Sequence, residues 1–154
     1  MINANHFWGM PDEEIVDGIL QIHNRIFANA DELVEKAASR PNILFVVAIE
    51  DNQVVGYKIG YSLSKERYYS WYGAVHEEYR GKGIASRLME LQHRLVKDAR
   101  YAIIETKTRN KWRNMLILNI KHGFDITETF IDDEGIHRIN LEKSLLDSKR
   151  EGGN

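Results

Sequence analysis

The stretch WYGAVHEEYRGKGIASRLMELQHRL, which runs from Trp71 to Leu95, decides the fold of this chain. It begins with aromatic and small apolar residues, turns through RGKGIA (residues 80–85), and continues with apolar residues at helical spacing. The apolar residues of this last part are Ile84, Leu88, Leu91 and Leu95. The stretch therefore predicts a strand, a glycine-containing turn and an amphipathic helix in direct succession.

The turn has the features of a receptor for phosphate oxygens. Gly81 and Gly83 allow the backbone to turn without a Cβ clash and to approach a ligand closely. The first N–H groups of the helix have no partner inside it and carry the positive end of its dipole. Arg80 and Lys82 add charge of the same sign. The alternative is a plain strand-to-helix connection that needs glycine and is solvated by its two basic residues.

Spacing excludes two other glycine-loop motifs. A dinucleotide-binding fingerprint needs a third glycine three residues after the second, where this chain has Ser86. A Walker loop needs Ser or Thr directly after Gly-Lys, and here Gly83 follows Lys82. The pattern that remains is Arg-x-x-Gly-x-Ala (residues 80–85) after a strand that ends at Val75. It resembles the acetyl-CoA signature of the GNAT superfamily of N-acetyltransferases.

The resemblance implies that residues 80–85 form a pyrophosphate loop for acetyl-CoA. It also implies that the preceding strand bulges near Gly73 and splays from its neighbour, so that the pantetheine arm inserts into the gap beside the backbone of Val75. Glycine inside a strand often marks such a bulge or a close approach. The cofactor-binding residues expected on this basis are Ala74, Val75, Arg80, Gly81, Lys82, Gly83, Ile84, Ala85 and Asn119.

A second point of resemblance is the segment that ends in Gly123-Phe124. Many GNAT members have an asparagine near the start of the preceding helix and a tyrosine four residues before Gly-Phe. In this chain Asn119 occupies the tyrosine position and Trp112 the asparagine position. The family tyrosine is the proposed acid that reprotonates the departing thiolate, and an asparagine side chain cannot take that role. Asn119 is expected to hydrogen-bond the pantetheine arm or the sulfur, with a satisfied core amide as the alternative.

Composition and charge narrow the remaining classes. A chain of 154 residues with 43% hydrophobic residues has the size and composition of one globular domain. Its net charge of −2 argues against nucleic acid or an anionic membrane as the main partner. Cysteine is absent and the six histidines lack ligand spacing, so we expect no metal site. With no apolar run long enough to cross a bilayer and no signal-peptide pattern, a cytoplasmic location is expected.

The whole chain predicts an α/β (α+β) fold, GNAT-like in arrangement. Strands are expected at residues 43–49, 54–63, 67–75, 101–106, 124–131 and 136–141. The first three should form an antiparallel meander, and the fourth should follow the glycine-turn helix by a right-handed crossover, parallel to the third. This gives a mixed, largely antiparallel central sheet with one parallel splayed strand pair, flanked by about four helices. We expect a single domain over residues 1–146 and a disordered tail over residues 147–154.

Two further expectations concern aromatic residues. The segment up to Met10 has no clear periodicity, and its Phe7 and Trp8 are expected to dock on the domain. The third strand carries Tyr68, Tyr69, Trp71 and Tyr72. Strict alternation places Tyr68 and Tyr72 on one face and Tyr69 and Trp71 on the other, so that one pair would pack in the core and the other would line a substrate cleft.

The chemistry implied by the resemblance is direct transfer of acetyl from acetyl-CoA to a primary amine of a small molecule or peptide. A strand N–H near Val75 would stabilise the oxyanion. Glu105, at the end of the parallel strand, is the candidate general base, with a salt-bridging surface carboxylate as its alternative role and His76 and Glu77 as other candidates. Two rival classes stay open: a non-catalytic acyl-CoA-binding or regulatory protein of the same fold, and an unrelated nucleotide binder. Monomer and homodimer are both compatible with the sequence.

Overall fold

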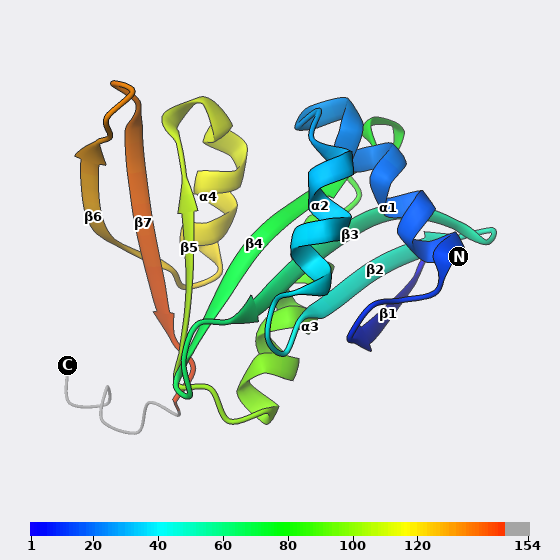
Figure 1. The fold of residues 1–154 in the computed structure, drawn as a ribbon, viewed down its shortest axis with the longest axis horizontal. Helices are drawn as coiled ribbons and strands as arrows, with labels where there is room; N and C mark the ends of the chain where they lie inside the picture. The colour runs from blue at the N-terminus through cyan, green and yellow to red at the C-terminus, as the bar shows by residue number, and fades with distance from the viewer. Residues whose placement is uncertain (147–154) are drawn as a thin grey trace.

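The computed structural model describes residues 1–146, which form a seven-stranded sheet in the order β1-β2-β3-β4-β5-β7-β6 (Figure 1). The tail predicted at residues 147–154 lies outside the described residues. In chain order the elements are β1 (Asn3–Trp8), α1 (Glu13–Ile26), α2 (Ala30–Ala38), β2 (Leu44–Glu50), β3 (Gln53–Ser62), β4 (Arg67–Val75), the 3-10 turn η1 (Glu77–Tyr79), α3 (Ile84–Asp98), β5 (Ile103–Thr108), the 3-10 turn η2 (Asn110–Trp112), α4 (Arg113–Lys121), β6 (Asp125–Ile131) and β7 (His137–Ser144). The predicted fold class, with its antiparallel meander, its parallel strand pair and its four α-helices, is confirmed.

The parallel pair β4–β5 diverges after a short contact. Arg67–Tyr69 of β4 pairs with Ile103–Glu105 of β5, and no later residue of β4 pairs with β5. β4 continues to Val75 paired only with β3, whereas β5 continues to Thr108 paired with β7. The two strands therefore open toward their C-terminal ends, which Figure 1 shows as the separation between β4 and β5.

The strand β1 was not predicted. It pairs antiparallel with β2 from Asn3↔Ile49 to Trp8↔Leu44 and forms one edge of the sheet. Half of the residues in its sequence, NANHFW, are polar, and no residue of the strand is fully buried. The two aromatic residues do dock as expected: Phe7 packs against the core under α1, and the Trp8 ring meets the Tyr68 ring edge-on at 6.4 Å.

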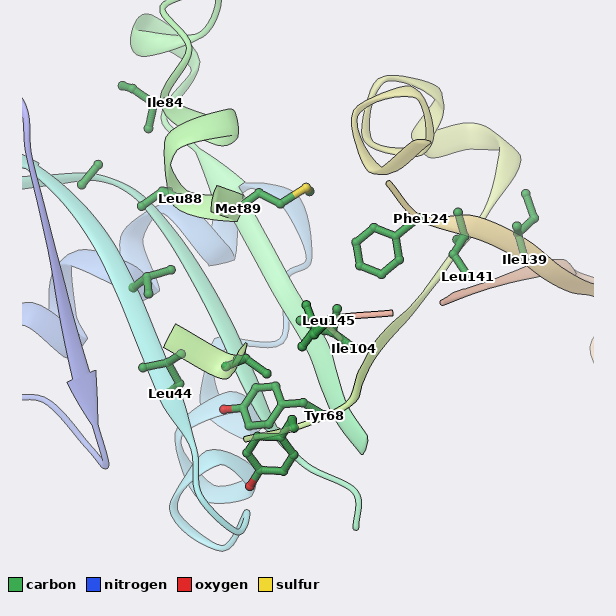
Figure 2. Close-up of a cluster of buried hydrophobic side chains, with 14 of the residues drawn as sticks. Leu44, Tyr68, Ile84, Leu88, Met89, Ile104, Phe124, Ile139, Leu141 and Leu145 are labelled. Carbon is green, nitrogen blue, oxygen red and sulfur yellow. The ribbon is translucent and has the colours of Figure 1, made fainter. Parts of the chain in front are cut away.

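Helices cover both faces of the sheet and divide the core into two clusters. α1 and α2 lie on one face, where Ile19, Ile22 and Leu33 are buried, and α3 lies on the other. Figure 2 shows the cluster under α3, in which Leu88 and Met89 share a core with residues of β2, β5 and β7. This core therefore joins the two halves of the sheet on one face, although their strands diverge. A Leu→Ala change at such a buried position costs about 2–5 kcal/mol.

The predicted faces of the β4 aromatic residues are wrong for Tyr72. Ile59 pairs with Tyr72, but Gly60 pairs with a residue two positions earlier, so that Trp71 is an extra residue in β4. Such a bulge moves all later side chains of the strand to the opposite face. Tyr68 consequently packs in the cluster under α3, whereas Tyr72 packs in the cluster under α1.

The bulge expected at Gly73 therefore lies at Trp71. Gly73 itself allows a side chain of the neighbouring strand β3 to come close to β4. Gly73 pairs with Lys58 of β3. A Cβ atom on Gly73 would lie 3.2 Å from Lys58 Cγ and 3.4 Å from Lys58 Nζ. The absence of a side chain at Gly73 lets the Lys58 side chain lie across β4.

Candidate functional site

The glycine turn leaves the start of α3 open. Gly81 and Gly83 both have φ of +80°, which favours glycine, and no atom of the described residues lies within 4 Å of where their Cβ atoms would be. Gly83 is the N-cap of α3, and within residues 1–146 no side-chain cap hydrogen bond is made to the first turn of the helix. The N–H groups of that turn are therefore available to an anion, as the sequence predicted.

The basic residues of the turn lie at its surface. Arg80 Nε donates a hydrogen bond to the Val75 carbonyl oxygen at 3.2 Å, which ties the turn to the end of β4. Because a guanidinium carries five N–H groups, the other donors of Arg80 can still bind an anion. Lys82 Nζ lies 5.1 Å from the centre of the Tyr79 ring. The two residues next to Gly81 in the sequence, Arg80 and Lys82, therefore bring positive charge to the turn that precedes α3.

Two residues considered as candidate bases have other contacts. The His76 side chain accepts a hydrogen bond from the Glu78 N–H at 3.1 Å and begins the turn η1. Glu77 forms an ion pair with Arg25 of α1 at 2.7 Å. Both side chains of that pair are more than half exposed, so the pair contributes little to stability. These contacts place η1 against α1 and so position the glycine turn.

A cavity of about 40 Å³ lies between β4, α3 and α4, which is space for a few water molecules. It is lined by Tyr57, Lys58, Gly73, Ala74, Val75, Ala85, Leu88, Met89, Met115 and Leu118. The pairing of β3 with β4 shows how the lining residues follow one another. Val75 pairs with Gly56, which lies near Ile84 at the start of α3. Gly73 pairs with Lys58, two residues farther along β3. The cavity therefore extends from the first turn of α3, at Ala85, to Lys58.

Because β4 and β5 diverge, backbone groups of β4 beside this cavity are left without a neighbouring strand. The Thr106 hydroxyl of β5 donates to the Ser70 carbonyl oxygen of β4 at 2.9 Å, at the point where the strands part. Beyond this point the β5-facing edge of β4 has no neighbouring strand, so its N–H and C=O groups lack ladder partners. Ala74 and Val75, the strand residues predicted to bind the cofactor, lie in this unpaired part.

Lys58 is a functional candidate that the sequence analysis missed. Its side chain is 8% exposed, and burial lowers its pKa to about 8. Within residues 1–146 its amine has no hydrogen-bond or ion-pair partner. The available signal was a lysine in the middle of the strand segment VVGYKIGY, whose neighbours are otherwise apolar or aromatic.

Asn119 is buried but lies outside the lining of the cavity. Its side chain is 3% exposed, and its backbone carbonyl accepts hydrogen bonds from the N–H groups of His122 and Phe124 at the end of α4. Met115 and Leu118 are the residues of α4 that line the cavity. The predicted contact between Asn119 and the pantetheine arm stays a prediction.

Glu105 lies where β4 and β5 part, at the last pair of the parallel register. Arg67 Nη1 donates to Glu105 at 2.8 Å and to Glu142 of β7 at 3.0 Å. A carboxylate in this position holds three strands together at the base of the divergence. To accept a proton from a substrate, Glu105 would have to give up part of its bond to Arg67. Its assignment as general base stays a prediction.

The opposite side of the sheet carries an aromatic cluster, which we define as Phe27, Tyr72 and Trp112. The Phe27 ring centre lies 4.9 Å from that of Tyr72 and 5.7 Å from that of Trp112. The Asn29 amide donates to the Tyr72 hydroxyl at 3.2 Å. The cluster joins the α1–α2 connection, β4 and η2 at the open ends of β4 and β5. The sequence indicated no contact among these three distant residues.

A buried histidine is linked by hydrogen bonds to the aromatic cluster. His23 of α1 is fully buried, and its two ring nitrogens make hydrogen bonds with the Tyr57 hydroxyl and the Asn29 side chain. Burial lowers the pKa of His23, which favours the neutral ring. The network fixes Asn29 and through it the hydroxyl of Tyr72.

The glycine turn, the divergent parallel pair and the adjoining cavity together form the candidate site, and comparison with a family model gives the class and the family of the chain. The model, described as an acetyltransferase (GNAT) domain, matches residues 41–126, more than half of the chain. The chain belongs to the GNAT acetyltransferase family, which confirms the resemblance drawn from its motifs. A comparison with curated proteins found no match.

Solved structures share the fold at low sequence identity. Ard1 from Thermoplasma volcanium has a TM-score of 0.81 at 17% identity, with 95% of this chain and 99% of that chain covered. The ribosomal-protein-S18-alanine N-acetyltransferase from Escherichia coli has a TM-score of 0.79 at 12% identity, with coverage of 97% and 98%. A GNAT family acetyltransferase from Elizabethkingia anophelis, with acetyl-CoA bound, has a TM-score of 0.73 at 19% identity, with coverage of 93% and 97%.

Two further observations concern membranes and metals. None of the helices within residues 1–146 combines the length and the apolar composition needed to cross a bilayer. In the same residues, no three His, Asp or Glu side chains come together as a metal-binding group.

Proposed function

We propose that this protein transfers the acetyl group of acetyl-CoA directly to a primary amine. The observation that carries the proposal is the continuity of the site: the open N-terminus of α3 adjoins a cavity that follows the unpaired edge of β4. An anionic group at the glycine turn and an extended arm along β4 would occupy neighbouring parts of one site. Acetyl-CoA has both parts, and the GNAT neighbour from Elizabethkingia anophelis binds it.

In this proposal the pyrophosphate binds at the N–H groups of residues 81–85, with Arg80 and Lys82 supplying positive charge. The pantetheine arm follows the backbone of Ala74 and Val75, along the part of β4 that has no β5 partner, and the Val75 carbonyl there already accepts a hydrogen bond from Arg80. The apolar side chains of α3 and α4 that line the cavity would exclude water from the arm. Asn119 is retained as a candidate hydrogen-bond partner of the arm.

The reaction proceeds by attack of the neutral amine on the thioester carbonyl carbon. The carbon–sulfur bond then breaks, the amide remains, and the CoA thiolate takes a proton. A backbone N–H near Val75 would stabilise the oxyanion of the tetrahedral intermediate. Holding both reactants in one site supplies much of the rate advantage. A lysine-like amine has a pKa of about 10.4, so deprotonating it at pH 7 costs roughly 4–5 kcal/mol, and Glu105 is the candidate base.

The acceptor amine would enter from the face that carries the aromatic cluster. Phe27, Tyr72 and Trp112 lie on the side of the sheet opposite α3, at the open ends of β4 and β5. Aromatic faces attract cations, and a substrate amine is cationic before it loses its proton. The acceptor class, a small-molecule amine or a peptide amine, is set by this face.

Titration calorimetry with acetyl-CoA on the wild-type protein and on Gly83→Asp tests the cofactor site. The added side chain and negative charge should abolish binding at the open helix terminus. Release of free CoA with a library of amines then tests transfer. Binding by the wild type, loss of binding in the variant and CoA release with an amine are the expected results. If neither protein binds acetyl-CoA, the proposal is wrong, and if binding occurs but no amine releases CoA, the non-catalytic acyl-CoA binder becomes the better explanation.

A further inference from the structure

Lys58 is a buried cation without a counter-charge. Taking an ammonium group out of water is costly unless it is paired, and structural lysines are therefore rarely buried alone. Among the described residues no carboxylate bonds to its Nζ. On α3, His93 is close enough for the charge of Lys58 to lower its pKa, and the His93 ring bonds to Lys143 of β7 at 2.9 Å. Neither supplies negative charge. Packing alone does not account for a lysine at this position.

The amine lies against the part of β4 that would hold the reactive end of the substrate. Lys58 Nζ is 3.4 Å from where a Cβ atom on Gly73 would be, and Gly73 is two residues before Val75. Both residues line the cavity, which reaches the first turn of α3 at Ala85. An arm that enters from the turn along Val75 would bring its thioester toward Lys58 at the inner end.

Burial also makes this amine reactive. Its pKa of about 8 leaves roughly a tenth of the molecules neutral at pH 7, whereas an unperturbed lysine with a pKa of about 10.4 is neutral in roughly one molecule in 2,500. A neutral amine held beside a bound thioester gains the further advantage of proximity.

We propose that Lys58 is a self-acetylation site, which takes the acetyl group from acetyl-CoA bound in the same cavity. The Lys58 nitrogen attacks the thioester carbonyl carbon, the carbon–sulfur bond breaks, and the proton lost by the nitrogen goes to the CoA thiolate. The products are Nε-acetyl-Lys58 and free CoA, and no other reactant is needed. Acetylation exchanges a buried cation for a neutral amide and so removes the cost of burying the charge. The inference rests on the proposed function, because it requires acetyl-CoA at the divergence of β4 and β5.

The test incubates the full-length protein with isotopically labelled acetyl-CoA in the absence of any amine acceptor. Proteolysis and mass spectrometry then locate the label, and calorimetry on the same preparation measures acetyl-CoA binding. We expect up to one acetyl group per chain on Lys58. Its labelling should be much faster than that of the exposed Lys65, because Lys58 lines the cavity that would hold the thioester and burial lowers its pKa.

Variants separate site-directed from random acetylation. Lys58→Arg and Lys58→Met should take no label at position 58 and no compensating label at another lysine, and the second keeps the test valid if the larger arginine disturbs folding. Lys65→Arg is the matched control and should be labelled at Lys58 like the wild type. Gly83→Asp should lose both binding and labelling.

The outcomes distinguish the two proposals. Acetyl-CoA binding without label on Lys58 overturns self-acetylation and leaves the proposed function intact. Equal labelling of Lys58 in Gly83→Asp, or of Lys65 in the wild type, also overturns it, because the acetylation would then be independent of the site. Absence of acetyl-CoA binding overturns the proposed function and this inference together.

Discussion

Gly73 and Lys58 face each other across β3 and β4, and the lysine side chain occupies the space that a side chain on Gly73 would need. A methyl group at Gly73 would lie 3.2 Å from Lys58 Cγ and 3.3 Å from the Tyr57 carbonyl oxygen, closer than ordinary contacts. The lysine side chain can shift by a few tenths of an ångström to relieve the first contact, whereas the second contact involves the backbone. The pair therefore sets the shape of the inner end of the cavity.

Gly73→Ala should lower the free energy of unfolding by about 1–3 kcal/mol, the usual cost of overpacking. It should also weaken acetyl-CoA binding, since the displaced lysine narrows the cavity. Urea denaturation and calorimetry measure the two effects. In the Lys58→Ala background the stability cost of Gly73→Ala should shrink, because the clashing side chain is gone. An unchanged cost in that background would show that the crowding comes from the Tyr57 backbone alone.

Lys58→Met should stabilise the protein at pH 7 and lose this advantage as the pH rises. The folded-state pKa of Lys58 is about 8, below its ordinary value of 10.5. Between these values the unfolded chain binds a proton that the folded chain has released, so wild-type stability rises with pH in this window. The shift corresponds to about 3 kcal/mol, fully present as destabilisation below pH 8.

Urea denaturation of the wild type and Lys58→Met at pH 7, 8.5 and 10 checks this prediction. Burial raises the pKa of Tyr57 and of Tyr68, so both proteins should lose stability above pH 10, and only their difference reports on Lys58. A constant difference between pH 7 and pH 10 would contradict the assigned ionisation of Lys58.

Arg80→Gln should weaken acetyl-CoA binding by about ten-fold or more, since a hydrogen bond to a charged group is worth about 1.5–3 kcal/mol. The loss should be smaller at high salt, where screening already weakens the wild-type contact. Calorimetry at low and high ionic strength measures both. Arg94→Gln, on the exposed side of α3, is the matched control and should bind like the wild type. Equal affinities of Arg80→Gln and the control for acetyl-CoA would show that Arg80 does not bind the cofactor. Its role would then be the hydrogen bond to the Val75 carbonyl oxygen.

The variant Glu105→Gln tests whether the Glu105 carboxylate acts as a catalytic base or only as a structural partner of Arg67. If Glu105 is the base, the variant should slow turnover with an amine and leave acetyl-CoA affinity nearly unchanged. If Glu105 only holds Arg67, turnover should be retained and stability should fall by about 1 kcal/mol or less, as for other partly exposed pairs. Glu142→Gln, which removes the second partner of Arg67, is the control for the structural effect. Full activity of Glu105→Gln would exclude Glu105 as the base.

Phe27→Ala should raise the KM for the amine and leave acetyl-CoA affinity unchanged, because Phe27 lies in the aromatic cluster and outside the lining of the cavity. Steady-state kinetics at saturating acetyl-CoA, together with calorimetry, measures the two quantities. Phe130→Ala on the exposed strand β6 removes the same side chain elsewhere and should change neither. An unchanged KM for Phe27→Ala would place the acceptor away from this cluster.

Local patterns predicted much of the fold, including the conformation of the glycine turn. The turn at Gly81 and Gly83 needs positive φ, and the following apolar periodicity defines α3, so the strand–turn–helix unit could be read without any distant contact. The meander and the final hairpin followed from short strands separated by polar turns. The strand β1 escaped prediction because an edge strand with two exposed faces has no apolar alternation.

The bulge at Trp71 shows where local reasoning fails. Gly60, opposite the bulge, has no room for a side chain: a Cβ there would lie 2.6 Å from Tyr68 Cε2 and 2.8 Å from the Tyr69 carbonyl oxygen. This crowding involves two strands and their register, which a pattern along one strand does not contain. A shift of one residue then moved Tyr72 to the face under α1 and made it part of the aromatic cluster.

The sequence by itself determined the glycine turn, the helix that follows it and the order of the central strands, because these depend on backbone conformation and on periodicity within short segments. Only the tertiary structure decided the pKa of Lys58 at the inner end of the cavity and the formation of the aromatic cluster. The pKa of Lys58 depends on α3 and α4 covering β3, and the aromatic cluster depends on Phe27 and Trp112 meeting across the open ends of β4 and β5. Burial and contact of this kind arise from packing between distant segments, which no local pattern records.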